Sequence, residues 1–484
     1  MQLVFIPVYI KYLGMEAYGL IGVFAMLQAG LLLLDMGMTP TLNREMARFS
    51  SGAHTSQSIR ELLHSLEMIC LGIAFLIAIS VWLASGWVSQ HWLRVEQLPL
   101  DTVSEAIVIM GLVAALRFIE GIYRGAILGL QNHVWLNAVN ATLATARGLG
   151  AVGILVWVSP TIEAFFIWQG CISLVSVIVL ALRVHRTLPI APLPVCFSKQ
   201  ALSGVWSFAW GMIATTFLSL LLTQVDKILL SRMLSLGTFG NYMLAATVAN
   251  SLTLLVVPLA QGYYPRFTEL VTRRDEPGLI AAYHQGSQLM MLMVVPVALI
   301  FIFHGETVLY LWTGDAVLAH NSAQLVALLA LGTAFLGLMN IPYMLQLAYG
   351  WSTFAAKVNA VIVVVQIPVL FWATSLYGAI GAAWVWVAIT SSYIFIVVYI
   401  MHHWLLPKEK WDWYLRDNGF PIASATFVAY AALWIHPVVL SKLGQLAWII
   451  TIGLASFTAA FLSVTSFRKT LFQIVTQRIS RLKI

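Results

Sequence analysis

Long apolar runs separated by short polar loops dominate this chain of 484 residues. A helix that crosses a bilayer needs about 20 mostly apolar residues. Runs of that kind occur at 17–38, 65–85, 104–129, 135–158, 162–183, 205–226, 236–258, 284–304, 322–348, 356–375, 378–401, 419–436 and 444–465. The opening stretch is also apolar, but its 12 residues would form a helix of only about 18 Å. The pattern predicts an all-α, multi-pass membrane protein.

A short motif recurs about 220 residues further along the chain. It consists of a basic residue, a leucine, an aromatic residue and a glycine: Lys11, Leu13, Tyr18 and Gly19 in the first half, and Arg232, Leu234, Phe239 and Gly240 in the second, at an offset of 221. Arg44 then matches Arg266 at an offset of 222. Chance similarity is the alternative, but the conserved order indicates a duplicated bundle. In a bilayer, duplication is typical of alternating-access transport around a site between the two halves.

The repeat also bears on the short opening segment. The run before the second motif begins near Gly204, and subtracting 221 places its counterpart at position −17, upstream of Met1. We therefore expect the first helix to be shortened by truncation or a misplaced start, which puts the activity of this chain in doubt. The predicted total is about fourteen helices in a MATE-like arrangement. The predicted divisions are an N-terminal six-helix bundle at 1–187, a cytoplasmic linker at 188–203, a second six-helix bundle at 204–403, two extra helices at 404–465 and a basic cytoplasmic tail at 466–484.

Composition and charge fit a membrane protein and exclude several other classes. Apolar residues make up 60% of the chain and charged residues only 9%, whereas soluble domains carry about 25% charge. The net charge of +7 lies mostly in alternate short loops and the tail. Such a bias orients helices, so it predicts that both termini are cytoplasmic and indicates no nucleic-acid partner.

Motifs of soluble enzymes are missing from the sequence. There is no Walker-type glycine loop, metal-spaced His/Cys set or nucleophile elbow. Cys70, Cys171 and Cys196 form no disulfide framework, and we expect them to fill the core. The sequence therefore predicts no enzyme, no metal and no cofactor, and leaves a proton or sodium gradient open as the energy source.

The densest set of charges within the apolar runs consists of Arg117, Glu120, Arg124 and Arg147. Spacings of three and four place the first three on one helical face, and Glu120 is positioned to bridge Arg117 and Arg147. Ionisable groups at membrane depth are costly and therefore candidate functional residues. One interpretation is a cationic, water-filled cavity for a phosphate or pyrophosphate, because arginine binds phosphate through two donors. The other is an ion cluster that only joins two helices.

Two aspartates are further candidates, with Glu120, for coupling or gating. Asp35 ends the run at 17–38, where it could equally be a water-exposed residue at a helix end. Asp226 stands beside Lys227, and the two could neutralise each other instead of taking part in a proton or sodium path.

Several motifs resemble bacterial polysaccharide flippases of the multidrug/oligosaccharidyl-lipid/polysaccharide exporter superfamily. They are Leu13-Gly14-Met15-Glu16-Ala17-Tyr18-Gly19, Leu34-Asp35-Met36-Gly37-Met38 with Arg44, and Asp226-Lys227-Ile228-Leu229-Leu230 followed by Gly240-Asn241-Tyr242. The resemblance covers the first twelve predicted helices, and the last two match in number only.

The resemblance implies an inner-membrane flippase that moves an undecaprenyl-pyrophosphate-linked oligosaccharide from the cytoplasmic to the periplasmic leaflet for O-antigen, capsule or exopolysaccharide synthesis. It implies that Arg117, Arg124 and Arg147 line the headgroup cavity, and that other glycan-assembly membrane proteins are candidate partners beside the bilayer. The alternatives are an ion-coupled multidrug exporter or a peptidoglycan lipid-precursor flippase of the same fold. A more distant alternative is a non-transporting glycan polymerase or scaffold.

Overall fold

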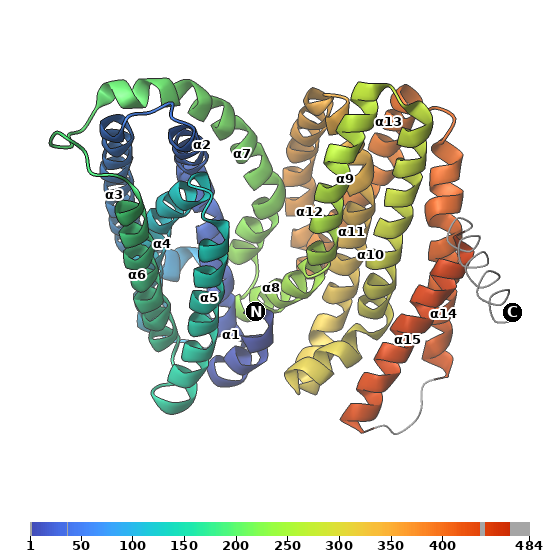
Figure 1. The fold of residues 1–484 in the computed structure, drawn as a ribbon. Coiled ribbons are helices and arrows are strands. Elements are labelled where there is room, and N and C mark those ends of the chain that lie inside the picture. Colours follow the sequence, from blue (N-terminus) through green and yellow to red (C-terminus); the bar gives the residue numbers. More distant parts are fainter. Residues whose placement is uncertain (1, 36, 436–440, 465–484) are drawn as a thin grey trace, which may run out of the picture. The chain divides into compact units, whose positions relative to one another are not determined.

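The computed structural model describes residues 2–35, 37–435 and 441–464, and Figure 1 shows them as helices joined by short segments. The predicted all-α class is confirmed. Ten of the described helices are long and apolar enough to cross a membrane, so the chain is a multi-pass membrane protein. The total of fourteen spanning helices stays a prediction.

The chain folds into two compact units, of which the first is Met1–Gly240. Its elements are α1 (Gln2–Leu34), α2 (Met38–Ser50), α3 (Ser56–Trp87), a short π-helix (Val88–Trp92), α4 (Leu100–Gly129), α5 (His133–Trp157), α6 (Ile162–Thr187), α7 (Lys199–Met233) and the start of α8 (Leu236–Asn250). Helix α4 lies at the centre, where it packs against α2, α3 and α6. Small residues such as Ala106 and Ala114 on α4 are completely buried, which allows these neighbours to approach closely.

The second unit is Asn241–Ile484. Its elements are the rest of α8, α9 (Thr253–Arg273), α10 (Glu276–Thr313), α11 (Ala316–Ala348), α12 (Ser352–Ser392), a π-helix (Tyr393–Val397), α13 (Val398–Leu405), a second π-helix (Asp412–Gly419), α14 (Phe420–Trp434) and α15 (Lys442–Ser463). Helices α10 and α11 form its core, since they pack on each other and α9 packs on both. The predicted basic tail at 466–484 lies outside the described residues.

Most helices extend beyond the apolar runs that predicted them. At the start of a helix, polar residues extend it outward from the apolar run, as far as a residue whose side chain caps the first backbone amides. Asp315, for example, accepts hydrogen bonds from the backbone N–H groups of Val317 and Leu318 at the start of α11. Hydropathy identifies the membrane-embedded part of a helix, so it places the ends too far inward.

Glycines divide two of the long helices where the sequence predicted separate runs. Gly14 in α1 has φ 82°, and Gly378 in α12 has φ 59°, in the region that glycine adopts readily. Without a break, the 54 residues of Ser352–Leu405 would extend about 80 Å, far more than a bilayer core. Gly378 therefore separates two helices of ordinary length, and Gly14 separates a short opening helix from the rest of α1.

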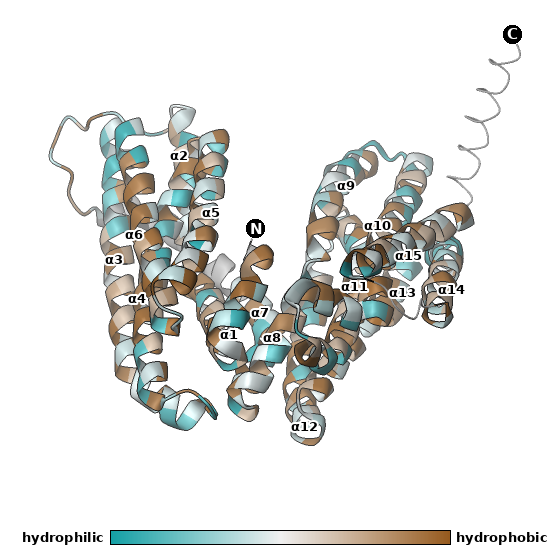
Figure 2. Ribbon diagram, turned by 90° about the horizontal axis from the view of Figure 1, so that it is seen from below, coloured by the Kyte–Doolittle hydropathy of each residue, from teal (hydrophilic) through white to brown (hydrophobic). Residues whose placement is uncertain are grey.

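Large apolar side chains are exposed along many helices. Phe75 and Leu76 on α3 and Trp372 on α12 are each more than half exposed, and Figure 2 shows hydrophobic residues along the helices of both units. In water such patches would favour aggregation, whereas lipid solvates them. The surface therefore agrees with membrane insertion.

The recurring motif brings its own two copies together within the first unit. A Cβ at Gly19 would lie 2.3 Å from the carbonyl oxygen of Leu236, and a Cβ at Gly240 would lie 2.5 Å from that of Met15. The offset of 221 relates Met15 to Leu236 and Gly19 to Gly240. The contact is therefore reciprocal, as across a local two-fold axis, and this geometry supports duplication.

Other details differ from the sequence prediction. The compact units divide after Gly240, because α7, expected to open the second bundle, packs against α1, α2 and α3. The predicted bundle boundaries, including the linker at 188–203, remain a prediction about the repeat. The expectation that the cysteines fill the core is correct for Cys70 but wrong for Cys171 and Cys196, which are exposed.

We expect Gly19→Ala and Gly240→Ala to destabilise the protein by about 1–3 kcal/mol each, because the new methyl group would collide with backbone carbonyls that cannot rotate away. Gly30→Ala in α1 and Gly237→Ala in α8 are matched controls, since a Cβ there meets nothing within 4 Å. The measurement is the midpoint of thermal unfolding in detergent. Equal midpoints for the two pairs of variants would contradict the close approach.

Candidate functional site

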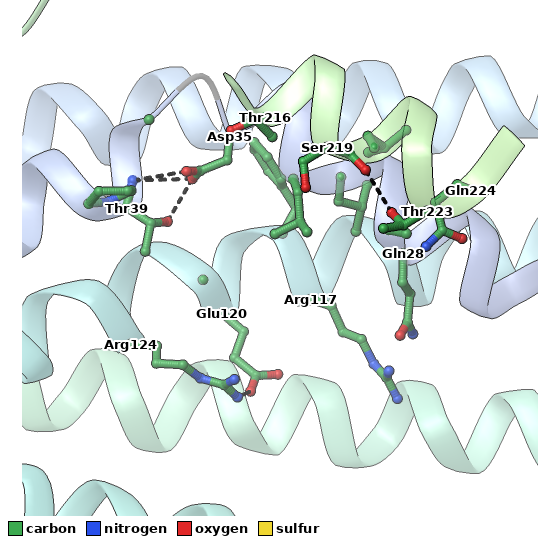
Figure 3. A pocket seen from close by; sticks show the side chains of 18 of the residues that line it. Gln28, Asp35, Thr39, Arg117, Glu120, Arg124, Thr216, Ser219, Thr223 and Gln224 are labelled. Atoms are coloured by element: carbon green, nitrogen blue, oxygen red, sulfur yellow. Dashed lines mark hydrogen bonds and ion pairs between the residues drawn. The ribbon is translucent and has the colours of Figure 1, made fainter. Parts of the chain in front are cut away.

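A cavity of about 770 Å³ lies within the first unit, among α1, α4, α5, α7 and the segment that leads into α2 (Figure 3). Its polar lining residues are Gln28, Asp35, Thr39, Arg117, Glu120, Arg124, Arg147, Thr216, Ser219, Thr223 and Gln224. Five of the six residues predicted from the sequence are among them, and Asp226 is not.

Glu120 on α4 pairs with two arginines, and one of them, Arg147, connects it to α5. Its carboxylate accepts a hydrogen bond from Arg124 at 2.5 Å and another from Arg147 at 3.0 Å. The Glu120 side chain is only 5% exposed, whereas that of Arg124 is 44% exposed. A buried carboxylate needs such partners, because an unpaired charge at this depth would cost several kcal/mol.

Arg117 takes a different partner from the one predicted. Its Nη2 donates to Oε1 of Gln169 on α6 at 3.1 Å, and its guanidinium carbon lies 5.1 Å from the ring centroid of Phe24. In the described part of the chain, Glu120 therefore bridges Arg124 and Arg147, rather than Arg117 and Arg147. Both arginines lie one helical turn from Glu120, but a glutamate that precedes its basic partner by four residues, as Glu120 precedes Arg124, pairs better than one that follows it, as Glu120 follows Arg117.

The arginines keep unused hydrogen-bond donors. The Nε atoms of Arg117 and Arg147 are buried and have no hydrogen-bond partner among the residues that the structure describes. Three arginines and two carboxyl groups line the cavity, so pairing leaves one positive charge in excess. Such a surface is suited to bind an anion with several oxygen acceptors.

Asp35 lies at the entrance to α2 and combines two features (Figure 3). Its carboxylate accepts hydrogen bonds from the hydroxyl of Thr39 at 2.6 Å and from the backbone N–H of Thr39 at 3.2 Å. Burial raises the pKa of Asp35 above its usual value, although both bonds from Thr39 oppose the shift. Asp35 is thus a helix-end residue, as one interpretation predicted, and also a cavity residue.

Asp226 lies on α7, where it pairs with its neighbour Lys227 at 3.3 Å. Lys227 also donates to the backbone carbonyl of Thr223 at 2.5 Å. The neutralisation anticipated from the sequence is present, and the structure does not bring Asp226 together with the other candidates.

Several cavity residues were not identified from the sequence. Gln28 on α1 and four uncharged polar residues on α7 belong to this set: Thr216, Ser219, Thr223 and Gln224. The α7 residues recur at intervals of three, four and one, which places them on one helical face. That pattern inside the apolar run at 205–226 was a readable signal. Gln169 gave no such signal, because its partner is distant in sequence.

A second buried polar cluster lies in the second unit, near the start of α10. His284 contacts Asp417 through Nδ1 and Glu409 through Nε2, the latter at 3.0 Å, and Gln288 donates to Asp417 at 2.7 Å. Burial raises the pKa of Asp417, against the hydrogen bonds from His284 and Gln288. The cluster fastens the Asp412–Gly419 π-helix to α10. Among the described residues, no group of three or more His, Cys, Asp or Glu side chains is arranged so that it could hold a metal ion.

The comparisons with known proteins agree on the class of this chain. Residues 1–271, more than half of the chain, match the family described as "Polysaccharide biosynthesis protein". A putative O-antigen transporter of Shigella flexneri is 21% identical over 376 residues, which cover 77% of this chain and 87% of the relative.

Solved structures share the fold at low sequence identity. The lipid II flippase MurJ in an inward closed conformation gives a TM-score of 0.73 at 12% identity, and the match covers 97% of each chain. An inward-facing multidrug resistance MATE family transporter of the MOP superfamily gives a TM-score of 0.57 at 12% identity, covering 100% of this chain and 96% of the other. These similarities confirm the predicted MATE-like fold.

We expect Glu120→Gln to destabilise the protein by about 2 kcal/mol, because it leaves Arg124 and Arg147 without a counter-charge. Glu269→Gln is the matched control, since Glu269 also bridges two arginines, at 2.9 Å each, but is 38% exposed. Exposed pairs contribute less than about 1 kcal/mol. Thermal unfolding of the purified variants in detergent measures both effects. If Glu269→Gln lowered the midpoint as much as Glu120→Gln, burial would not be the cause.

Proposed function

The chain belongs to the polysaccharide biosynthesis protein family, and we propose that it is a flippase for a polyprenyl-pyrophosphate-linked oligosaccharide. The observation that carries the proposal is the cavity lined by Arg117, Arg124 and Arg147. Lipid-linked oligosaccharides carry their negative charge on the pyrophosphate that joins lipid and glycan. An anion-binding cavity within a multi-pass membrane protein lowers the main free-energy barrier to flipping, which is the transfer of that charge through the bilayer.

Arginine fits the chemistry of this headgroup. Its planar guanidinium can donate two hydrogen bonds to one phosphate and stays charged at all physiological pH values. Arg117 and Arg147 hold their positions through Gln169 and Glu120, so the donors are oriented before the ligand arrives. Preorganised donors bind more tightly because less side-chain entropy is lost.

The size of the cavity sets which part of the substrate enters. A volume of about 770 Å³ is within the range of ligand sites for molecules of drug size. It accommodates a pyrophosphate and the first sugars, and the polyprenyl chain remains in the lipid. Alternating access then requires movement of the helices around the bound headgroup, not passage of the lipid tail through the protein.

Two other transporters of the same fold are the alternatives. Their substrates differ from the proposed one in charge or in the glycan that they carry. A multidrug exporter of cationic compounds would need excess carboxylates, whereas this cavity has excess arginine. A peptidoglycan lipid precursor also carries a pyrophosphate, so the cavity charge alone does not separate it from other glycans. The family and the O-antigen transporter relative support an O-antigen, capsule or exopolysaccharide unit.

The proposal includes a location and an orientation. We place the protein in the bacterial inner membrane with both termini in the cytoplasm, because most Lys and Arg residues fall in alternate loops and in the C-terminal tail. The direction of transport is then from the cytoplasmic to the periplasmic leaflet. Other glycan-assembly membrane proteins are candidate partners in the same process.

Asp35 is our candidate for coupling to protons. It lines the same cavity as the arginines, and its raised pKa brings its titration closer to neutral pH. Protonation would remove a negative charge and leave the cavity more cationic. Asp226 and Glu120 are the other candidates, but each already pairs with a basic residue.

We expect Arg117→Ala and Arg147→Ala to reduce transport by roughly 10- to 100-fold, the effect of losing a charge-assisted hydrogen bond to phosphate. The assay uses purified protein in liposomes with the lipid-linked oligosaccharide extracted from the source cells. Arg273→Ala, at an exposed residue of α9, is the control and keeps full transport. Unchanged transport in both cavity variants would reject the headgroup site. Absence of transport by the wild-type protein would favour a polymerase or scaffold.

We expect binding of the same substrate to strengthen as the pH falls through the raised pKa of Asp35, because protonation removes a repelling carboxylate. Asp35→Asn should bind tightly over the whole range and lose this pH dependence. Asp226→Asn should keep it, since Asp226 lies outside the cavity lining. Titrations of substrate affinity from neutral pH down to the ordinary range of a carboxyl group provide the measurement. A retained pH dependence in Asp35→Asn would assign the proton site elsewhere.

A further inference from the structure

The cavity has two chemically different walls. Helices α4 and α5 contribute the charged residues, and α7 contributes Thr216, Ser219, Thr223 and Gln224, all of them uncharged. These four residues lie on one face of α7, and Figure 3 shows that they come from the same helix. Polar side chains within a membrane-spanning segment are costly unless they face water, a ligand or a partner on another helix.

Part of this uncharged surface has hydrogen-bonding capacity left over. The Thr223 hydroxyl donates to the backbone carbonyl of Ser219 at 2.9 Å, so its oxygen remains free to accept. Gln28, on α1, lines the same cavity, and its buried Nε2 has no hydrogen-bond partner among the described residues. An amide donor that is buried without a partner destabilises the protein, and a ligand acceptor would remove that cost.

Sugars match this surface better than they match the arginines. A glycan presents many hydroxyl groups, each both donor and acceptor, and most carry no charge. Side-chain amides also offer donors and acceptors, and hydroxyls do the same. Neutral groups can exchange water for sugar hydroxyls without the large desolvation cost that charged groups incur.

We propose that Gln28, Ser219, Thr223 and Gln224 form the subsite for the first sugars of the glycan, beside the arginine subsite for the pyrophosphate. The inference rests on the proposed function, because it assumes that a lipid-linked oligosaccharide is the substrate. It assigns affinity for the headgroup to α4 and α5, and discrimination among glycans to α1 and α7. A site that pairs with a substrate hydroxyl rejects analogues in which that hydroxyl is missing or misplaced.

Binding of two probes by the full-length protein in detergent separates the two subsites. One probe is polyprenyl pyrophosphate without sugar, and the other is the lipid-linked oligosaccharide extracted from the source cells. We expect Gln28→Leu, Gln224→Leu and Thr223→Val each to weaken binding of the oligosaccharide probe about tenfold, as expected from one or two lost hydrogen bonds. Binding of the sugar-free probe should stay within about twofold of wild type. Arg117→Ala should weaken both probes.

Thr458→Val is the matched control for Thr223→Val. Thr458 is also exposed and donates to the backbone carbonyl four residues before it, at 2.7 Å, but it lies on α15 in the second unit. It should leave binding of both probes unchanged. The midpoint of thermal unfolding of each variant, measured alongside, selects the variants that fold as wild type does.

The outcomes distinguish this inference from the proposed function. If the folded α1 and α7 variants bind the oligosaccharide probe as tightly as wild type, or lose both probes equally, the sugar subsite is wrong and the flippase proposal stands. If the wild-type protein binds neither probe, the proposed function fails and the subsite fails with it.

Discussion

The pairing of Glu120 with Arg124 and Arg147 is the interaction on which the site depends. In a medium of low dielectric, three arginines on two neighbouring helices would repel one another and pull water into the core. One buried carboxylate, 5% exposed, joins α4 to α5 and leaves part of the positive charge available. The same residue thus links α4 to α5 and sets the charge that a ligand meets.

In the proposed function, one cavity serves a substrate of two chemical parts. Fixed positive charge binds a pyrophosphate well but does not distinguish one glycan from another, because any phosphate satisfies it. We propose that the uncharged residues of α1 and α7 contribute less affinity per contact and more selectivity for the geometry of the glycan. Relatives that move different glycans could therefore share the α4 and α5 wall and differ on α7.

The sequence predicted the fold class well because membrane helices follow simple rules. Apolar length identified the helices, and the breaks at Gly14 and Gly378 lie where separate runs were predicted. Charge inside the apolar runs identified Arg117, Glu120 and Arg147, since such residues are rare in lipid. The partner of Arg117 could not be predicted from the sequence. Gln169 is 52 residues away, and tertiary packing decides which helices meet. The polar face of α7 could be predicted from spacing alone. Uncharged polar residues are common in membrane helices, however, so they are weaker evidence for a site than arginines.

The reciprocal contact of Gly19 with Leu236 and of Gly240 with Met15 has a consequence for biosynthesis. Gly19 and Leu236 are 217 positions apart and Met15 and Gly240 are 225 apart, and ribosomes add about 5–20 residues per second. The middle of α1 thus waits on the order of 10–40 seconds before its partner is made. Helix α1 also contacts α4 and α5. These two helices are synthesised before α7 and α8, so they can hold α1 in place until then. The first unit is complete only once this contact has formed, and all of its residues precede α9 in the chain.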